Sequence, residues 1–552
     1  MGLRFLFLTL APLALLASEQ MLYLVQSGDV QKGIEMYLNG KKEDENHDFE
    51  ILEQMGHILL EQGSNSSDPE IQLLSIYGCG IAGKADTLSI FERGVLSANP
   101  LTQMAAIQFL GKLDDDRSSS ILAHAFNSQF LGARLEAAYY LAQRKNPLAT
   151  QQLEALMLKL PPFFRVYFPE FYALIGTPKA VSLLRGLMND PELNVRSAAM
   201  LSAADFGRDD LLGYMRAAAT HKNPAEQEVS AIALGRLGDT HSKDTLKKML
   251  KSPYDNVKLA AMRSLAMLGE TNICESITEL AKSGDLFAIL ALGAFPEAAD
   301  TLKQFLQSDN RDQKLNAALA LLQLKDPDCT LSIAELLTAR PLECACQPIF
   351  STGKAQSAWR FAPASERYAK LTQTDIIAIT LNLKERILQS TIELPEQNFL
   401  QIADIILNCR VIPLIPSLVH LLENKKNEGA IQLLKKHTNA IGSPLIRGYC
   451  NLVLFRLGEE GPYEQQVVLE TLRLKDTELI RFRPATPKTG QSNNYSPFTL
   501  TPEETSRLLI DSYQTLSMRH DSKSIDILLR AISDGNPKNR YALAGLLLKA
   551  LE

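Results

Sequence analysis

The sequence is poor in the residues that carry covalent and metal chemistry. Its 552 residues include seven cysteines, eight histidines and one tryptophan, Trp359. The cysteines are scattered and odd in number, which argues against a disulfide framework. No histidine stands at metal-ligand spacing from another histidine or a cysteine, and the HExxH, phosphate-loop and GxSxG patterns are absent. We therefore expect no catalytic residues, no cofactor and no metal, and we predict that the chain is not an enzyme.

Two local clusters have alternative interpretations. Cys344 and Cys346, separated by one alanine, are either a redox or metal site or two small apolar residues near a loop. The usual behaviour of free cysteine favours the second interpretation. The acidic run 114–116 is either a cation site or a solvated turn, and the lack of spaced ligands favours the turn.

A strong charge of one sign is also lacking. The net charge is −6, and basic residues form only isolated pairs such as Lys247 with Lys248. A nucleic-acid-binding protein usually carries a basic stripe that neutralises phosphates, so we do not expect nucleic acid as a partner. A weakly acidic surface is typical of a soluble protein that meets other proteins, and we expect protein partners whose identity the sequence does not give.

Long apolar runs are absent apart from one at the N-terminus. Residues 5–17 are uncharged and almost wholly apolar, follow Arg4 and precede Ser18 and Glu19. This pattern predicts a signal peptide over 1–18, because the run is too short to span a bilayer. If the leader is cleaved, the protein is exported to the periplasm or cell envelope. The alternative is an uncleaved apolar helix on a cytoplasmic or membrane-associated protein.

What the sequence does have is an internal repeat with a period of 31 residues. Eight residues after each starting position stands Gly or Ala, and eleven residues after it stands Gly in five of seven units. Prolines three or five residues before the starting positions follow Asp, Asn or Ser in most units. The seven starting positions are Gln72, Gln103, Arg134, Arg165, Arg196, Gln227 and Lys258.

Each column of the repeat has a physical reason. Asp, Asn and Ser cap the first turn of a helix, and proline is tolerated there. A Gly or Ala at plus eight allows close helix packing, and a glycine at plus eleven can take the left-handed conformation that ends a helix. A second apolar helix follows in each unit. Stacked two-helix units predict an all-α fold, an α-α superhelix or solenoid.

The segment Asp190-Pro191-Glu192-Leu193-Asn194-Val195-Arg196 resembles the HEAT repeat, and the short period is most similar to the HEAT-like repeats named after phycobilisome lyases. The resemblance covers about residues 65–340. It implies that Val195 and Arg196 lie on a helix lining the concave face. It also implies that Arg196 pairs with acidic groups near the turns, in a hydrogen-bond ladder between repeats. The chain departs from the pattern at Phe168 and Gln227.

The pattern predicts six segments along the chain. They are a signal peptide (1–18), N-terminal capping helices (19–64), the HEAT-like solenoid (65–340), a degenerate helical continuation (341–480), a linker rich in Pro, Gly and Asn (481–502) and a C-terminal helical unit (503–552). Because Asn536-Pro537 precedes Arg540 as in the main array, the last unit is expected to be a repeat that the linker detaches from the others.

An aromatic-rich stretch crosses two of the repeats. Tyr139, Tyr140, Phe164 and Tyr172 are either a binding hot spot or the filling of a core widened by Phe168. The function that the sequence favours is a non-catalytic protein-binding scaffold or adaptor, with a place in the bacterial cell envelope if the leader is cleaved. The alternative is an enzyme or chromophore-binding protein resembling the phycobilin lyases, although no residue of that activity can be carried over.

Overall fold

The computed structural model describes residues 19–41, 47–84, 87–113, 115–339, 376–439, 443–480 and 500–552. The predicted signal peptide, Cys344, Cys346 and most of the predicted linker lie outside these residues. In the part of the chain that is described, every regular element is a helix. The predicted all-α fold of stacked helical hairpins is confirmed.

The chain divides into two compact units. The first contains residues 1–137 and 422–552, and the second contains residues 138–421. The first unit is therefore built from both ends of the chain, and the second is inserted between them. This division does not test the predicted segment boundaries, which stay predictions.

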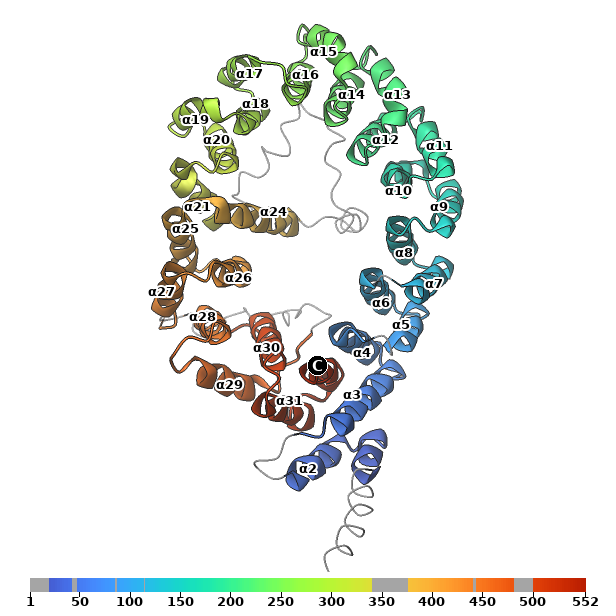
Figure 1. Ribbon diagram of the computed structural model, residues 1–552, viewed down its shortest axis with the longest axis vertical. Coiled ribbons are helices and arrows are strands. Elements are labelled where there is room, and N and C mark those ends of the chain that lie inside the picture. Colours follow the sequence, from blue (N-terminus) through green and yellow to red (C-terminus); the bar gives the residue numbers. More distant parts are fainter. Residues whose placement is uncertain are drawn as a thin grey trace, which may run out of the picture. The chain divides into compact units, whose positions relative to one another are not determined.

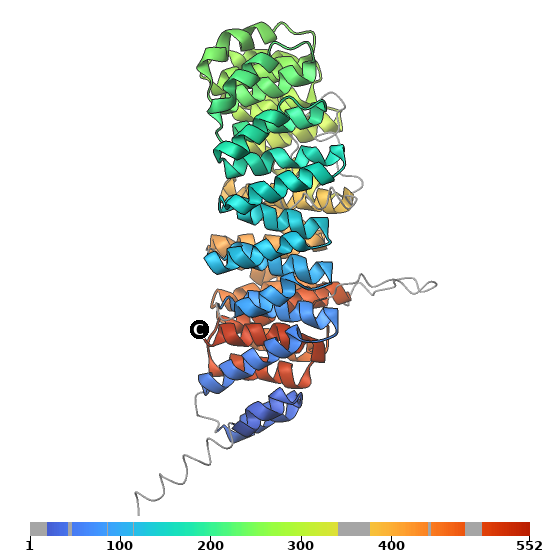
Figure 2. The same ribbon diagram turned by 90° about the vertical axis from the view of Figure 1, so that its right-hand side faces the viewer.

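The second unit is a two-layer stack of hairpins (Figures 1 and 2). Alternate helices form one layer, in which α12 packs on α14 and α14 packs on α16, and each of these helices also packs on its partner in the other layer. The inner layer (Figure 1) contains α10 (Phe168–Ile175), α12 (Leu193–Asp205), α14 (Pro224–Arg236), α16 (Asp255–Met267), α18 (Leu286–Ala291) and α20 (Arg311–Gln323). The outer layer contains α9 (Pro147–Lys159), α11 (Pro178–Leu187), α13 (Leu212–Ala218), α15 (Lys243–Met249), α17 (Ile273–Lys282), α19 (Ala299–Phe305) and α21 (Thr330–Thr338). Helices α24 (Ile376–Ser390), α25 (Glu396–Asn408) and α26 (Ile415–Lys425) follow.

The predicted start and stop signals act as expected. Asn223 caps α14 by accepting a hydrogen bond from the backbone N–H of Ala225 at 2.9 Å, and Pro224 is the first residue of that helix. Gly83, Gly176, Gly207, Gly238 and Gly269, all in the plus-eleven column, have φ between 64° and 81°. The same column holds Lys145 in the left-handed conformation, with φ 53°, and Lys325 follows the end of α20 in the same way, with φ 61°.

The small residues at plus eight bring neighbouring helices into close contact. A Cβ atom added to Gly235 on α14 would lie 2.6 Å from the Cβ and 2.8 Å from the Cα of Ser264 on α16, the next helix of the same layer. Ser264 also donates a hydrogen bond from its hydroxyl to the Ala231 carbonyl at 2.7 Å. The column is small because helix backbones pass close to one another at this position.

One repeat deviates where Phe168 replaces the small plus-three residue. Its inner helix α10 begins only at Phe168, after a 3-10 segment, Pro162–Tyr167. Pro169 explains the late start, because a proline is tolerated only in the first turn of a helix. Phe168 is 1% exposed, so its ring fills the core of this repeat.

The first unit joins the two ends of the chain (Figure 1). Its N-terminal part contains α2 (Val30–Gly40), α3 (Phe49–Ser64), α4 (Pro69–Ala82), α5 (Leu88–Val95), α6 (Pro100–Lys112), α7 (Asp116–His124) and the start of α8 (Leu131–Gln143). Its C-terminal part contains α27 (Glu428–His437), α28 (Pro444–Arg456), α29 (Tyr463–Leu474), α30 (Pro502–Ser517), α31 (Ser522–Asp534) and α32 (Arg540–Ala550). The last helix, α32, packs on α3, α4, α30 and α31.

Glycines allow α32 to approach α3 and α4 closely. A Cβ atom added to Gly545 would overlap the carbonyl oxygen of Gly78, and one added to Gly56 would lie 2.8 Å from the side chain of Leu548. Residues 542–548 of α32 are all buried. An entirely buried helix is hydrophobic on all sides, which is why this segment has no polar face.

Polar contacts link the same two ends. Lys538 forms an ion pair with Glu70 at 2.5 Å, and His47 Nε2 lies 3.1 Å from the Ser522 carbonyl oxygen. Burial lowers the pKa of His47. The neutral ring therefore donates from Nε2 and accepts from the Tyr37 hydroxyl at Nδ1. The expectation of a detached last repeat is wrong, because α32 is a central helix of the first unit.

The left-handed lysine gives a test of the plus-eleven column. We expect Lys145→Gly to raise the free energy of unfolding by about 0.5–1 kcal/mol, because glycine relieves the steric cost of positive φ. The matched change Gly207→Ala should lower it by about 1 kcal/mol, since no atom lies within 4 Å of the added Cβ and the cost is conformational alone. Chemical denaturation measures both. Equal signs for the two variants would contradict the assignment.

The contact between α32 and α4 gives a second test. We expect Gly545→Val to destabilise the first unit by at least about 3 kcal/mol, because the new side chain overlaps backbone atoms of α4. The control is Gly186→Val on α11, where an added Cβ meets nothing within 4 Å. Proteolysis followed by mass spectrometry should show early cleavage in both α4 and α32 of the first variant alone. Cleavage confined to α32 would show that the N-terminal helices do not depend on it.

Candidate protein-binding surface

At four of the seven starting positions, the side chain folds back on the turn before its own helix. There a side-chain N–H donates to the carbonyl oxygen six residues earlier, which fixes the turn against the helix. The pairs are Gln72 with Ser66 (2.7 Å) and Gln103 with Ser97 (2.6 Å) in the first unit, and Arg196 with Asp190 (2.7 Å) and Gln227 with His221 (2.7 Å) in the second.

The same column links each repeat to the next. In the first unit, the Ser97 hydroxyl donates to Gln72 at 3.3 Å, and the Ser128 hydroxyl donates to Gln103 at 2.6 Å. In the second unit, Arg165 donates to Asp190 at 2.9 Å. In all three pairs, the donor and the acceptor are 25 residues apart in sequence. These bonds form an inner ladder along one edge of the stack.

The structure places Arg196 against Glu226, in the first turn of α14. Arg196 Nε donates to Glu226 Oε1 at 2.6 Å, and Arg196 Nη1 also donates to the Pro191 carbonyl at 2.9 Å. Glu226 additionally pairs with His221. Val195 is buried, with 2% of its surface exposed, and packs in the core.

Three starting positions have no such bond to the next repeat among the described residues. Gln227 bonds only to its own turn. Lys258 pairs within its own helix, 3.2 Å from Asp255. Arg134 has a buried Nε atom that finds no hydrogen-bond partner among the described residues. The ladder therefore links some of the repeats and is interrupted at others.

A second, outer ladder of ion pairs in the second unit was missed from the sequence. In each pair a base on an outer helix meets an acid 23 residues later, in the turn after the next inner helix. The pairs are Arg216 with Asp239 (2.6 Å), Lys247 with Glu270 (2.9 Å) and Lys303 with Asp326 (3.0 Å). The signal that could have revealed them is an acidic residue directly after the left-handed position, as in Gly238-Asp239 and Gly269-Glu270.

Asp239 is the most strongly held of these acids. Both carboxylate oxygens accept from Arg216, and Ser242 donates to the same group. These hydrogen bonds lower the pKa of Asp239 to about 2, although burial opposes the shift. Ionised Asp239 therefore stabilises the fold over most of the pH range.

The aromatic stretch divides between core and surface. Tyr172 is fully buried in the core, so it is not available to a partner in this structure, and burial raises its pKa. Tyr139 and Tyr140 are half-buried, with ring centroids 5.6 Å apart. Phe164 is also half-buried and lies 6.3 Å from the ring of Tyr167. A binding role for Tyr139, Tyr140 and Phe164 stays a prediction.

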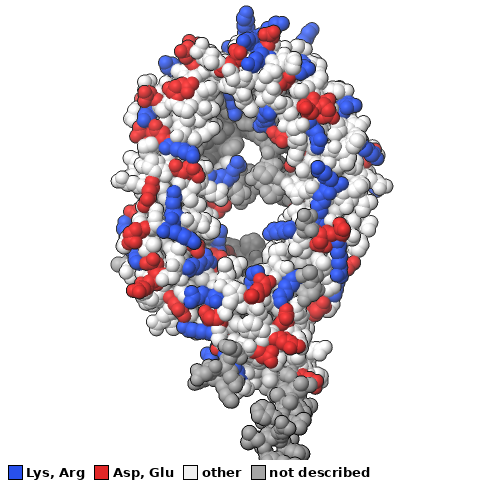
Figure 3. All heavy atoms as spheres, viewed as in Figure 1, with Lys and Arg blue, Asp and Glu red and all other residues white. Residues whose placement is uncertain are grey.

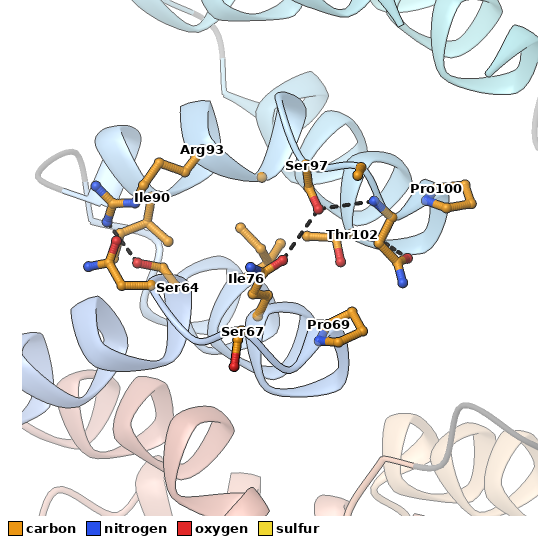
Figure 4. A pocket seen from close by; sticks show the side chains of 14 residues that line it. Ser64, Ser67, Pro69, Ile76, Ile90, Arg93, Ser97, Pro100 and Thr102 are labelled. Atoms are coloured by element: carbon orange, nitrogen blue, oxygen red, sulfur yellow. Dashed lines mark hydrogen bonds between the residues drawn. The ribbon is translucent and has the colours of Figure 1, made fainter. Parts of the chain in front are cut away.

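The first unit contains a pocket of about 670 Å³ at the seam between two repeats (Figure 4). It lies where the turns before α4 and α6 meet α5. Buried Ile76 and Ile90 form its apolar part. Its polar lining consists of Ser64, Asn65, Ser67, Gln72, Arg93, Ser97, Asn99 and Thr102.

Chemistry-bearing clusters are scarce among the described residues. There, no group of three or more His, Cys, Asp or Glu side chains is placed to hold a metal ion. Cys79, Cys274, Cys329, Cys409 and Cys450 are free thiols. Burial raises the pKa of Cys329 and of Cys450 to about 12, which suppresses thiolate formation. None of the described helices combines the length and apolarity that crossing a membrane requires.

Comparison with known proteins gives no family. No family model matches the sequence, and no curated protein matches it. The solved structures with similar folds include a homology model of the full-length AP-3 complex in an intermediate open conformation (11% identity, 83% of this chain and 92% of the other, TM-score 0.29). They also include the structure reporting that Kap95p binding induces the switch loops of RanGDP to adopt the GTP-bound conformation (10%, 94% and 80%, TM-score 0.31) and UNC-45 from Drosophila melanogaster (13%, 96% and 81%, TM-score 0.29).

The outer ladder predicts a pH dependence. Because the pKa of Asp239 is lowered from 3.8 to about 2, its stabilisation is fully present above pH 3.8 and is lost as the pH falls through 2. We expect Asp239→Asn to cost about 1–2 kcal/mol at pH 7, and the difference from the wild type to shrink below pH 3. The control is Asp205→Asn, whose ion pair with Arg236 is half exposed and should contribute little. Denaturant titrations between pH 2 and 7 measure both; a pH-independent difference would refute the role of the charge.

Proposed function

We propose that the chain is a non-catalytic scaffold that binds protein partners along the seams between its helical repeats. The observation that carries this proposal is the polar seam itself: turns fixed by the inner ladder, with a pocket of about 670 Å³ between two of them. Stacked repeats offer long continuous surfaces to partners. Fixed turns lower the entropy that binding costs, because the contact residues are already ordered.

The distribution of charge supports a protein partner. On the face shown in Figure 3, acidic and basic side chains are interspersed over the outer helices of the second unit. On these outer helices, neighbouring charges of opposite sign neutralise one another, which disfavours a polyanion there.

We further propose that the protein is exported and acts in the cell envelope, where it assists the assembly or tethering of other components. Support for export comes from the sequence of residues 1–18 alone. Removal of this segment would leave a mature chain that begins close to residue 19, just before the N-terminal helices.

The phycobilisome-lyase-type resemblance supports a second candidate, a protein that binds or transfers a bilin. It rests on the repeat sequence around Asp190 and Arg196 and on no residue of the activity itself. Absorbance spectra of the purified full chain with added bilin distinguish the two. A stoichiometric shift of the bilin spectrum would favour this candidate over the scaffold.

In-cell photo-crosslinking tests the scaffold most directly. A photoreactive amino acid placed at Asn194, exposed at the start of inner helix α12, should give a discrete adduct with a partner. The same amino acid at Ser182, exposed on outer helix α11, is the matched control and should give less of that adduct. Equal adducts at both positions, or none, would contradict the proposal.

The same samples test export. Mass spectrometry should find a mature N-terminus near Ser18 or Glu19. An intact Met1 would overturn export while leaving the scaffold proposal to be decided by the adducts.

A further inference from the structure

The pocket at the seam of the first unit has a neutral lining. Arg93 is its one charged residue. Its Nη2 atom donates to Glu61 at 2.5 Å and to the Ser64 hydroxyl at 2.8 Å, while its buried Nε has no hydrogen-bond partner among the described residues. The Glu61 carboxylate neutralises this one positive charge, so the pocket has little net charge with which to attract a phosphate or a carboxylate. The pocket therefore favours an uncharged polar ligand.

Two amide side chains from different turns each keep one free hydrogen-bonding atom. Asn65 donates from Nδ2 to the Glu61 carbonyl at 2.9 Å, and its Oδ1 has no partner among the described residues. Asn99 accepts at Oδ1 from the first turn of α6, at 2.9 Å from the Leu101 nitrogen, and its Nδ2 has no described partner. The two asparagines thus offer one free acceptor and one free donor, the complement of an amide group.

A buried hydroxyl in the same pocket wall is also unsatisfied. Thr102 is 1% exposed, and its Oγ1 finds no hydrogen-bond partner among the described residues. Buried polar atoms without a hydrogen-bond partner are rare. Such an atom usually bonds to a ligand or a water molecule, or gains a partner by a small local shift. Figure 4 shows Thr102 beside Ser97, on the side of the pocket formed by α6.

The apolar part of the pocket completes the match to a peptide. Ile76 and Ile90 are 1% and 3% exposed, and Pro69 and Pro100 stand exposed at the rim. A side chain of a bound segment can contact this apolar part while its main-chain amides meet the asparagines. Main-chain hydrogen bonds combined with side-chain pockets are a recurring mode of peptide recognition.

We propose that the pocket between α4, α5 and α6 binds a short extended peptide segment through its main-chain amides. This inference rests on the proposed scaffold function and names the kind of surface by which one partner is held. Asn65 accepts a main-chain N–H, and Asn99 donates to a main-chain carbonyl.

Methyl NMR of the full-length protein, labelled at isoleucine δ1 methyl groups, tests the proposal. The probe is N-acetyl-dialanine N-methylamide, which is uncharged and carries three amide groups. Saturable shifts are expected for Ile76 and Ile90 in the pocket, and none for Ile289, which is buried in the second unit. Absence of saturable shifts at Ile76 and Ile90 would overturn the proposal.

The decisive variant is Asn99→Asp. Aspartate still caps α6, so the helix is retained, but the free donor is replaced by a charged acceptor. We expect probe affinity to fall at least fivefold, the effect of losing a net hydrogen bond. The control is Asn223→Asp, the same cap in a repeat of the second unit, which should leave affinity unchanged. Unchanged affinity in Asn99→Asp would overturn the amide-recognition proposal.

Sodium acetate as a second probe separates an anion site from a peptide site. Shifts of Ile76 and Ile90 with acetate but not with the dialanine amide would assign the pocket to anions at Arg93 and overturn the proposal. Failure here is distinguishable from failure of the scaffold proposal. A crosslinked partner at Asn194 with no peptide bound in the pocket would remove this inference alone, whereas peptide binding without any crosslinked partner would remove the scaffold.

Discussion

The structure depends on close helix packing at positions without side chains. Gly235 meets Ser264 on the next helix so closely that a single methyl group would displace it, and Gly78 meets Gly545 backbone to backbone. In the first case the contact joins consecutive repeats, and in the second it joins helices more than 460 residues apart in sequence. The same device, a small residue on a packed helix face, therefore links neighbouring repeats and links the ends of the chain.

Two ladders of polar side chains lie at the edges of the packed helices. The inner ladder, as in Arg165 with Asp190, fixes the turns between hairpins, and the outer ladder, as in Arg216 with Asp239, ties the outer helices of the second unit to those turns. Most of these groups are half-buried, so their bonds are partly shielded from water and hold the turns in fixed positions. The consequence for function is a set of ordered turns, which is the surface on which both proposals rely.

The repeat itself could be predicted because its causes are local. Capping by Asn223, the prolines at helix starts and the left-handed glycines each follow from a few adjacent residues. Lys145 and Lys325 show the limit of this reasoning. The register imposes the left-handed conformation there although no glycine reveals it. The all-α solenoid was therefore predictable, together with the residues that cap and end its helices.

The features that the sequence did not predict depend on contacts between segments that are distant in the chain. No local pattern links Gly545 to Gly78, so α32 was expected to be a detached repeat, whereas it is a buried central helix. The sequence could not decide whether Tyr172 is buried or exposed, because aromatic residues occur both in cores and in binding sites. The structure shows that it is buried. The pocket beside Asn99 is likewise made by two turns whose proximity only the stacked structure reveals.

The central claim is that close packing at small residues makes the two ends of the chain one cooperative structure. Native-state hydrogen exchange of the full-length protein measures this directly, because amides of a cooperative unit open with a common free energy. We predict that the amides of α4 and α32 exchange with the same opening free energy, and that both respond equally to low denaturant. Exchange of α32 at much lower free energy than α4 would contradict it, and would show that the C-terminal helix is an appendage to an N-terminal stack that is stable without it.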